Sequence, residues 1–218
     1  MSDRRGALCV FAKPPMPGRV KTRLVPALGV EGAAHLAHAV LCDTWSSARA
    51  LPWASPILAT THVFPPALRP APDAVVWMQG SGDLGRRIER ILARALGRFP
   101  FAIALGADTP GLPVRFLEEA RVALGSADAV VGPTEDGGFY LLGLRRCPRG
   151  LLAGLPWSDR DTCARTLERL RARGLITVVL DSWFDIDRPE DLDRLRALLG
   201  RGELAAPATC RALGRTQA

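Results

Sequence analysis

Short runs of apolar residues alternate with longer amphipathic segments along most of this chain. Seven such runs are rich in apolar residues, and several are apolar at every position, which is typical of β-strands covered on both faces of a sheet. These predicted strands are Ala7–Ala12, Pro56–Thr61, Ala74–Gln79, Phe101–Asp108, Asp128–Pro133, Phe139–Leu144 and Ile176–Asp181.

The segments between these runs predict helices. In Leu84–Leu96 the apolar residues fall on one stripe of a helix, with arginines on the opposite side. Pro189–Leu199 has a proline and two acids in its first turn, which favours a helix start. Asp161–Arg173 follows Ser158, whose spacing to Asp161 resembles a capping box. The other predicted helices are Gly32–Arg49 and Val114–Leu124.

Strands that alternate with helices indicate an α/β fold with a mostly parallel central sheet. A length of 218 residues fits one domain, which we place at residues 1–200. Residues 201–218 have no clear periodicity, and we expect a flexible C-terminal tail there. Because ligands of open parallel sheets bind beyond the carboxyl ends of the strands, the residues that follow each strand are the candidates for function.

Charge alone says little about the partners of this chain. Lys and Arg total 29 against 22 acidic residues, and only two of the cations, Lys13 and Lys21, are lysines. Most arginines are interleaved with acids in helical stretches, so we expect no nucleic-acid binding despite the net charge of +7.

The five cysteines and the hydropathy pattern exclude other classes. No two cysteines form a CxxC pair, so the sequence predicts neither a disulfide framework nor a zinc finger. No segment reaches the roughly 20 apolar residues of a membrane span, and the run Ala7–Ala12 is too short for a signal peptide. We expect a soluble, cytoplasmic protein that binds no membrane.

The loop after the first strand is stiffened by three prolines and contains no acid over Lys13–Leu24. It carries four cations and a hydroxyl: Lys13, Arg19, Lys21, Arg23 and Thr22. Arginine offers a planar fork to phosphate oxygens and lysine a compact point charge, so this loop predicts a polyphosphate site. A solvated basic turn is the alternative.

A glycine-rich segment follows the third predicted strand. Gly80–Gly85 matches the G-x-G-x-x-G fingerprint of dinucleotide binding, but the acid expected about 20 residues later is absent. We favour a backbone loop that lies close to a flat ligand, with the Gln79 amide facing a base edge. A plain tight turn into a helix is the alternative.

Acidic residues follow three later strands. Asp108, between glycine and proline turn residues, is placed to hold Mg²⁺ together with substrate phosphates, or else to cap the next helix. Asp136 precedes Gly137 and Gly138, which predicts either a backbone surface for a substrate or a hairpin turn.

Asp185 and Asp187 stand two residues apart, just before the last predicted helix. In an extended segment they face the same side. Either one can cap that helix, and Asp187 can instead be a second metal ligand that converges with Asp108.

These clusters, in this order, resemble the GT-A-like nucleotidyltransferase/glycosyltransferase superfamily. The resemblance is strongest to small bacterial transferases labelled arsenosugar-biosynthesis or radical-SAM-associated glycosyltransferases. More distantly, the chain is similar to the guanylyltransferases of molybdenum-cofactor synthesis and to the phospholactate guanylyltransferases of deazaflavin-cofactor synthesis. The matching segments are Phe11–Leu24, Gln79–Arg87, Asp108–Leu112, Gly132–Gly143 and Asp185–Leu192.

The resemblance implies a single-domain, GT-A-like three-layer sandwich and assigns roles to particular residues. Metal, Mg²⁺ or Mn²⁺, would be held by Asp108 and Asp187. Residues implied in catalysis are Lys21, Arg23, Asp108 and Asp136. Residues implied in binding the nucleotide are Lys13, Gly18, Arg19, Lys21, Thr22, Gln79 and Gly80. Gly137 and Gly138 are implied in binding as well and would face the acceptor together with Asp136.

The resemblance implies a transferase that uses a nucleotide donor and a small-molecule acceptor. The working hypothesis is nucleotidyl transfer from an NTP to a phosphorylated or hydroxylated acceptor, with release of pyrophosphate. The alternative is glycosyl transfer from a nucleotide-sugar. The sequence departs from the usual pattern of both classes. Its first loop is rich in proline, where nucleotidyltransferases usually have glycine, and Asp108 stands in Asp-Thr-Pro, where metal-dependent glycosyltransferases have a D-x-D motif. Remote alternatives are an NAD-type oxidoreductase and a nucleic-acid-binding module. The motifs leave the nucleotide base, the acceptor and the oligomeric state undefined.

Overall fold

The structure is a computed structural model that describes residues 5–157 and 159–214. Ser158, to which the predicted capping box refers, lies outside the described residues. Seven strands form one sheet in the order β3-β2-β1-β4-β6-β5-β7. The strands are β1 (Gly6–Ala12), β2 (Ala54–Thr60), β3 (Val76–Met78), β4 (Ala102–Gly106), β5 (Ala129–Pro133), β6 (Phe139–Leu144) and β7 (Thr177–Val179). Strand β6 is antiparallel to β4 and β5, and the other neighbours are parallel, so the predicted α/β fold with a mostly parallel sheet is confirmed.

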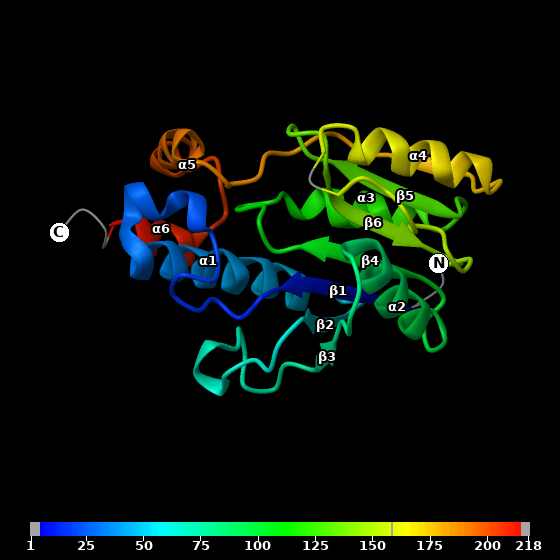
Figure 1. Ribbon diagram of the computed structural model, residues 1–218, viewed down its shortest axis with the longest axis horizontal. Helices are drawn as coiled ribbons and strands as arrows, with labels where there is room; N and C mark the ends of the chain where they lie inside the picture. Colours follow the sequence, from blue (N-terminus) through cyan, green and yellow to red (C-terminus); the bar gives the residue numbers. More distant parts are fainter. Residues whose placement is uncertain (1–4, 158, 215–218) are drawn as a thin grey trace.

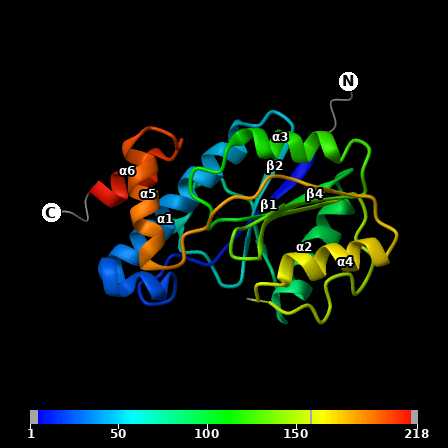
Figure 2. The same cartoon turned by 90° about the horizontal axis from the view of Figure 1, so that it is seen from above.

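Helices cover both faces of the sheet (Figure 1). The helices are α1 (Val25–Ala50), α2 (Leu84–Leu96), α3 (Val114–Ala123), α4 (Thr162–Ala172), α5 (Pro189–Gly200) and α6 (Pro207–Gly214), with short 3₁₀ helices η1 (Thr22–Leu24) and η2 (Pro66–Leu68). Side chains of α2 and α4 pack in one core layer, and those of α1 and α3 pack in the layer on the opposite face. Helices α5 and α6 lie at one end, beside the N-terminal part of α1 (Figure 2).

Strand β1 shows why the chain forms these layers. Its residues alternate between the faces, so Cys9 packs in the layer of α2 whereas Leu8 and Val10 pack in the layer of α1. All three side chains are completely buried. Because burying one leucine or valine contributes roughly 1.5–3 kcal/mol, a continuously apolar strand is stable only between two helical layers.

Helix α1 begins earlier than predicted and contains a break. The backbone at Gly29 is non-helical, with φ 71°, a conformation that glycine adopts without steric cost. By length and composition, Thr22–Ala50 is apolar enough to cross a membrane, which corrects our expectation that no segment is. In this fold many of its apolar side chains pack in the core, as Leu41 and Trp45 do.

The C-terminal segment differs from the prediction. The expectation of a tail without regular structure is wrong for Pro207–Gly214, which form α6. The buried carboxylate of Asp43 on α1 accepts hydrogen bonds from the backbone nitrogens of Ala208 (2.9 Å) and Thr209 (2.8 Å) and from the Thr209 hydroxyl (2.7 Å). The N-terminus of α6 is thus capped by a residue far away in the sequence, which local periodicity cannot reveal.

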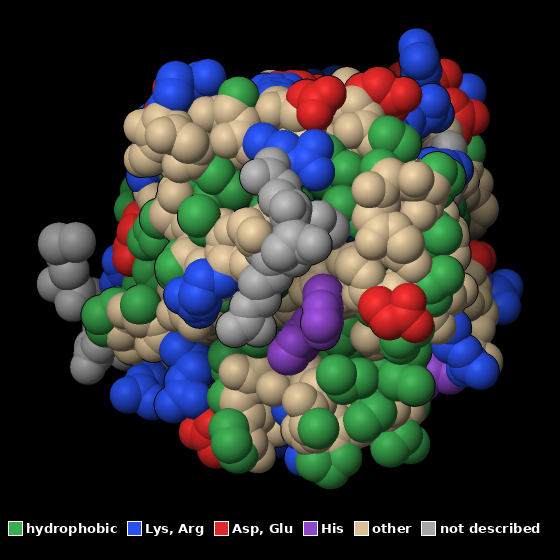
Figure 3. Space-filling view, turned by 90° about the vertical axis from the view of Figure 1, so that its left-hand side faces the viewer, with side chains coloured by type: hydrophobic (Ala, Val, Ile, Leu, Met, Phe, Trp, Pro, Cys, Tyr) green, Lys and Arg blue, Asp and Glu red, His purple; other side chains and the backbone are tan. Residues whose placement is uncertain are grey.

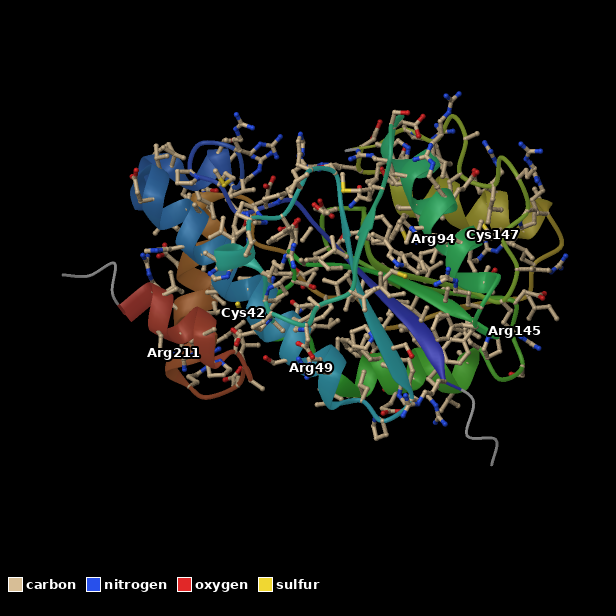
Figure 4. The ribbon with its side chains drawn as sticks, turned by 90° about the horizontal axis from the view of Figure 1, so that it is seen from below. Cys42, Arg49, Arg94, Arg145, Cys147 and Arg211 are labelled. Atoms are coloured by element: carbon tan, nitrogen blue, oxygen red, sulfur yellow. The ribbon has the colours of Figure 1, made fainter. Side chains whose placement is uncertain are left out.

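The cysteines form no disulfide in the described residues, and one of them lies beside a histidine. Cys9 and Cys163 are buried, and all five cysteines are free. Cys42 and Cys147 lie on opposite sides of the molecule (Figure 4). His38 lies beside Cys42, 3.6 Å from its sulfur, and the described residues contain no group of three or more His, Cys, Asp or Glu side chains that could hold a metal by themselves.

Charged side chains are mixed on the end of the molecule that carries α5 and α6. Figure 3 shows Lys and Arg side chains in separate groups on this face, interspersed with acidic and hydrophobic ones. Several arginines have partners elsewhere: Arg49 pairs with Asp73 at 2.8 Å, and Arg94 stacks on the ring of Trp77.

Candidate active site

A pocket of about 800 Å³ opens at the carboxyl ends of the central strands. Its walls come from the residues after β1, β2, β3 and β4, from the turn before β6, and from the segment before α5. The predicted site residues that line it are Lys13, Arg19, Lys21, Thr22, Arg23, Gln79, Asp108, Asp136, Gly138 and Asp187. The structure therefore brings together most of the candidates, although Gly18, Gly80 and Gly137 are not among its lining residues.

The basic loop turns sharply before η1. Gly18 has φ 72°, and Lys21 is the only described residue other than glycine with a positive φ, at 47°. Such a backbone conformation costs free energy in a residue with a side chain, and it persists where the surroundings hold it. Because Lys21 is part of the predicted phosphate loop, this strained backbone lies at the pocket.

Lys21 is held between two distant segments. Its ammonium lies 2.7 Å from Oδ1 of Asp108 and donates a 2.5 Å hydrogen bond to the carbonyl of Ile186. The backbone nitrogen of Ile186 in turn donates to the carbonyl of Asp108 at 3.2 Å. Lys21 thereby joins the loop after β1 to the end of β4 and to the segment before α5.

Arg23, like Lys21, contacts one of the two predicted metal ligands. Its guanidinium forms an ion pair with Asp187. By contrast, Lys13 and Arg19 are exposed and form no ion pair with any described residue. The four loop cations, which the sequence presents as one group, thus fall into two pairs with different surroundings.

The acids fit a divalent metal that is shared with a ligand. Asp108 and Asp187 offer hard oxygen atoms, which suit Mg²⁺ or Mn²⁺. The described part of the chain has no set of three or more ligating side chains close enough to enclose a metal. Since Mg²⁺ in nucleotide sites commonly uses one or two carboxylates plus phosphate oxygens, these two acids fit that kind of site.

Asp185 is a pocket residue to which the sequence analysis gave no catalytic or binding role. Burial raises the pKa of its carboxyl to about 6, with further contributions from the charges of Asp136 and Asp187 against an opposing effect of Lys21. The alternative that Asp185 or Asp187 caps α5 is wrong. Arg188 is the N-cap residue of α5, and Asp191 accepts from the backbone nitrogens of residues 187 and 188 at 2.9 and 2.7 Å.

The Asp136 turn connects β5 to β6 as a hairpin, the alternative that the sequence left open. Oδ1 of Asp136 accepts hydrogen bonds from the Thr134 hydroxyl at 2.5 Å and the Gly138 nitrogen at 2.9 Å, which orients the carboxylate at the pocket. Gly137 has φ 94° and faces the backbone of Arg160, where an added Cβ would lie 2.0 Å from the carbonyl oxygen. Gly137 therefore packs against protein rather than offering its surface to a substrate, which corrects that part of the prediction.

Gln79 also differs from its predicted role. The side chain is buried, and its Nε2 donates to the carbonyl of Ala59 at 2.8 Å. Oε1 accepts from Nη1 of Arg87 at 3.4 Å. The amide that we expected to face a base edge is thus occupied by protein groups.

The glycine segment after Gln79 forms a tight turn into α2, as the alternative interpretation expected. Gly80 and Gly82 both have positive φ, and Asp83 caps α2 by accepting from the Arg86 nitrogen at 2.8 Å. Arg90 covers Gly80, where an added Cβ would lie 2.6 Å from Nη1.

Two further pocket residues were not singled out from the sequence. Arg87 ends the motif Gln79–Arg87, so its position in that motif is a signal that could have been used. Trp157 lines the pocket from the loop before α4 and packs edge-on against Phe139. That loop has no regular pattern, and its approach to the pocket depends on the tertiary fold.

Solved structures share this fold. A protein from Desulfovibrio desulfuricans G20, provisionally described as a nucleotide-diphospho-sugar transferase, is 27% identical with a TM-score of 0.88, over 100% of this chain and 96% of that one. CMP:2-keto-3-deoxy-manno-octonic acid synthetase in complex with CTP is 14% identical with a TM-score of 0.58, over 91% and 99%. Glucosyl-3-phosphoglycerate synthase from Mycobacterium tuberculosis, in complex with Mn²⁺ and UDP, is 13% identical with a TM-score of 0.55, over 92% and 81%. The predicted GT-A-like fold is confirmed.

Sequence comparisons place the chain in a family. No curated protein matches the sequence. The family model described as "Uncharacterized protein conserved in bacteria (DUF2064)" matches residues 38–159, which is more than half of the chain. The chain therefore belongs to the DUF2064 family.

Proposed function

We propose that this protein transfers a nucleotidyl group from an NTP to a small phosphorylated or hydroxylated acceptor, with Mg²⁺ or Mn²⁺ and release of pyrophosphate. The observation that carries the proposal is the distribution of charge in one pocket. Lys13 and Arg19, which have no acid partner among the described residues, share this pocket with the carboxylates of Asp108, Asp136 and Asp187. A polyphosphate with a divalent cation complements both sets of charges.

The loop cations would bind the phosphates that leave. In the reaction an acceptor oxygen forms a bond to the α-phosphorus, and the bond from that phosphorus to the oxygen bridging to the β-phosphorus breaks. The electron pair of the broken bond leaves with pyrophosphate. Lys13 and Arg19 would hold the negative charge that develops there, so catalysis rests mostly on positioning and electrostatics.

The acids would serve the metal and the acceptor. Asp108 and Asp187 would hold Mg²⁺, and a bound Mg²⁺ neutralises charge on phosphate oxygens. Lys21 and Arg23 orient these two carboxylates. Asp136, fixed through one oxygen by Thr134 and Gly138, would accept the proton of a hydroxyl acceptor. A phosphate acceptor is already ionised and needs no base.

Glycosyl transfer from a nucleotide-sugar is the second candidate. The structure of the Desulfovibrio desulfuricans protein, 27% identical over the whole chain and described as a nucleotide-diphospho-sugar transferase, favours it. On this alternative Asp136 would contact the sugar. The narrower resemblance to arsenosugar-biosynthesis transferases stays a prediction.

Product analysis separates the two reactions. The protein is incubated with Mg²⁺, the dialysable small-molecule fraction of a bacterial extract as a source of acceptors, and either single NTPs or UDP- and GDP-sugars. Release of pyrophosphate from an NTP supports nucleotidyl transfer, and release of a nucleoside diphosphate from a nucleotide-sugar supports glycosyl transfer. If no nucleotide binds or raises the melting temperature in the presence of Mg²⁺, both proposals are wrong.

A further inference from the structure

Arg87 on α2 is a pocket cation outside the basic loop. Its side chain is half-buried and lines the same pocket as Lys13 and Arg19. It forms no ion pair with a described residue, whereas the neighbouring Arg86 is exposed, approaches Asp83, and lies outside the pocket. An arginine that faces a pocket without an acid partner is available to bind a ligand.

Gln79 holds the guanidinium of Arg87 in place. Because Nε2 of Gln79 donates to the carbonyl of Ala59, its Oε1 is turned toward Arg87 and accepts from Nη1. Nε of Arg87 donates to the carbonyl of Asp83 at 3.3 Å. These contacts use Nε and one N–H of Nη1, which leaves one N–H of Nη1 and both N–H bonds of Nη2 able to donate to two adjacent acceptors of a ligand.

Arg87 lies on α2, the helix that follows β3, whereas the phosphate loop follows β1. Strand β3, which ends just before Gln79, is two strands away from β1 in the sheet order. Since neighbouring strands lie about 4.8 Å apart, the support for Arg87 is roughly 10 Å from the end of β1. Asp108 follows β4, Asp136 follows β5 and Asp187 follows β7, and all three strands lie on the other side of β1. A nucleotide with its phosphates between the loop and the acids therefore has room to extend its ribose and base toward β3.

We infer that Arg87, positioned by Gln79, binds the edge of the donor's base and that this base is guanine or cytosine. The inference rests on the proposed use of a nucleotide donor. A guanidinium only donates, so its two prongs need two adjacent acceptors. Guanine presents O6 and N7 side by side, and cytosine presents O2 and N3. Adenine places an amino group beside N7, and uracil places an N–H between its two oxygens, so neither offers such a pair.

The test compares nucleotide affinities in four proteins. Binding of GTP, CTP, ATP and UTP is measured by titration calorimetry with Mg²⁺ for the wild type, Arg87→Lys, Gln79→Met and the control Arg86→Lys. Melting temperatures without nucleotide check that each variant is folded. The readout is the ratio of affinities between bases, because a purely structural defect lowers all four affinities together.

The wild type is expected to bind GTP or CTP on the order of 10- to 100-fold more tightly than ATP and UTP. Arg87→Lys should remove most of this preference, Gln79→Met should reduce it, and Arg86→Lys should keep it. A wild-type preference for ATP or UTP overturns the inference, and so does a loss that is equal for all four nucleotides in Arg87→Lys, which would assign Arg87 to the phosphates or the ribose. Absence of binding by every nucleotide overturns the proposed function itself, a different result from binding without base preference.

Discussion

The ammonium of Lys21 lies 2.7 Å from a carboxylate oxygen of Asp108, and this contact joins the loop after β1 to the end of β4. The lysine side chain is only 9% exposed, and its ammonium also donates to the carbonyl of Ile186. Lys13, the only other lysine of the chain, is exposed and has no such enclosure. Substitution of each of the two lysines should therefore have a different effect on activity.

Lys21→Arg should lose most activity while the protein stays folded. A planar guanidinium is larger than an ammonium and donates in fixed directions, so we expect it not to keep both the contact with Asp108 and the hydrogen bond to Ile186, and the carboxylate to change its position. We expect the rate of pyrophosphate or nucleoside diphosphate release to fall on the order of 100-fold, with a melting temperature within a few degrees of wild type. Lys13→Arg is the comparison: Lys13 is exposed and has no acid partner among the described residues, and arginine keeps the charge that would bind the leaving phosphates, so this variant should lose less activity than Lys21→Arg. Full activity of Lys21→Arg would contradict this account.

Removal of divalent cations should stop the reaction. Asp108 and Asp187 line the pocket, and the described residues contain no group of three ligating side chains that could hold a metal by themselves, so we expect the metal to bind together with the nucleotide. We expect EDTA to abolish activity and Mg²⁺ or Mn²⁺ to restore it.

Asp108→Asn should raise the Mg²⁺ concentration for half-maximal activity on the order of 10-fold or more. Asp193→Asn changes an exposed acid on α5 that pairs with Arg196, and it should leave the Mg²⁺ dependence unchanged. Activity that persists in EDTA would refute a metal role for these acids.

The ion pair of Glu135 with Arg194 should make stability depend on acid pH. Hydrogen bonds from Arg194 hold the pKa of Glu135 below its usual value. A lowered pKa in the folded state means that the stabilisation is fully present above the unfolded pKa, about 4.3, and is lost as the pH falls through the folded pKa.

Glu135→Gln should therefore melt a few degrees below wild type at pH 7, and the difference should shrink below about pH 4. The measurement is thermal unfolding across pH. Glu203→Gln is the control, because its pair with Arg201 joins residues only two apart and fastens no distant segments. A difference that grows as the pH falls would have the wrong sign for this ion pair.

Asp43→Ala should destabilise the protein by about 2 kcal/mol or more, because it removes three hydrogen bonds to the start of α6 and leaves backbone N–H groups unpaired. The measurement is urea unfolding. Asp73→Ala removes an acid from an exposed pair with Arg49 and should cost less than about 1 kcal/mol. Equal effects of the two substitutions would mean that α6 adds little to the stability of the fold.

The sequence by itself determined the elements and the edge of the sheet at which the candidate site lies. Runs such as Leu8 to Val10 predict buried strands, because a strand covered on both faces needs apolar residues at successive positions. The stripe that includes Ile88 and Ile91 predicts α2, because its apolar face must turn inward. Strand ends carry the cations and acids, and parallel strands bring their carboxyl ends to one edge.

Only the tertiary structure decided how those residues are partnered. A motif shows that Lys21, Arg23, Asp108 and Asp187 share an edge, but it does not show which cation meets which acid, since these contacts join segments far apart in the sequence. The same holds for Gln79, whose amide binds Ala59 across neighbouring strands. It also holds for α6, whose cap comes from α1. Hydrophobic periodicity acts through local geometry, whereas ion pairs and buried hydrogen bonds depend on the three-dimensional arrangement of the folded chain.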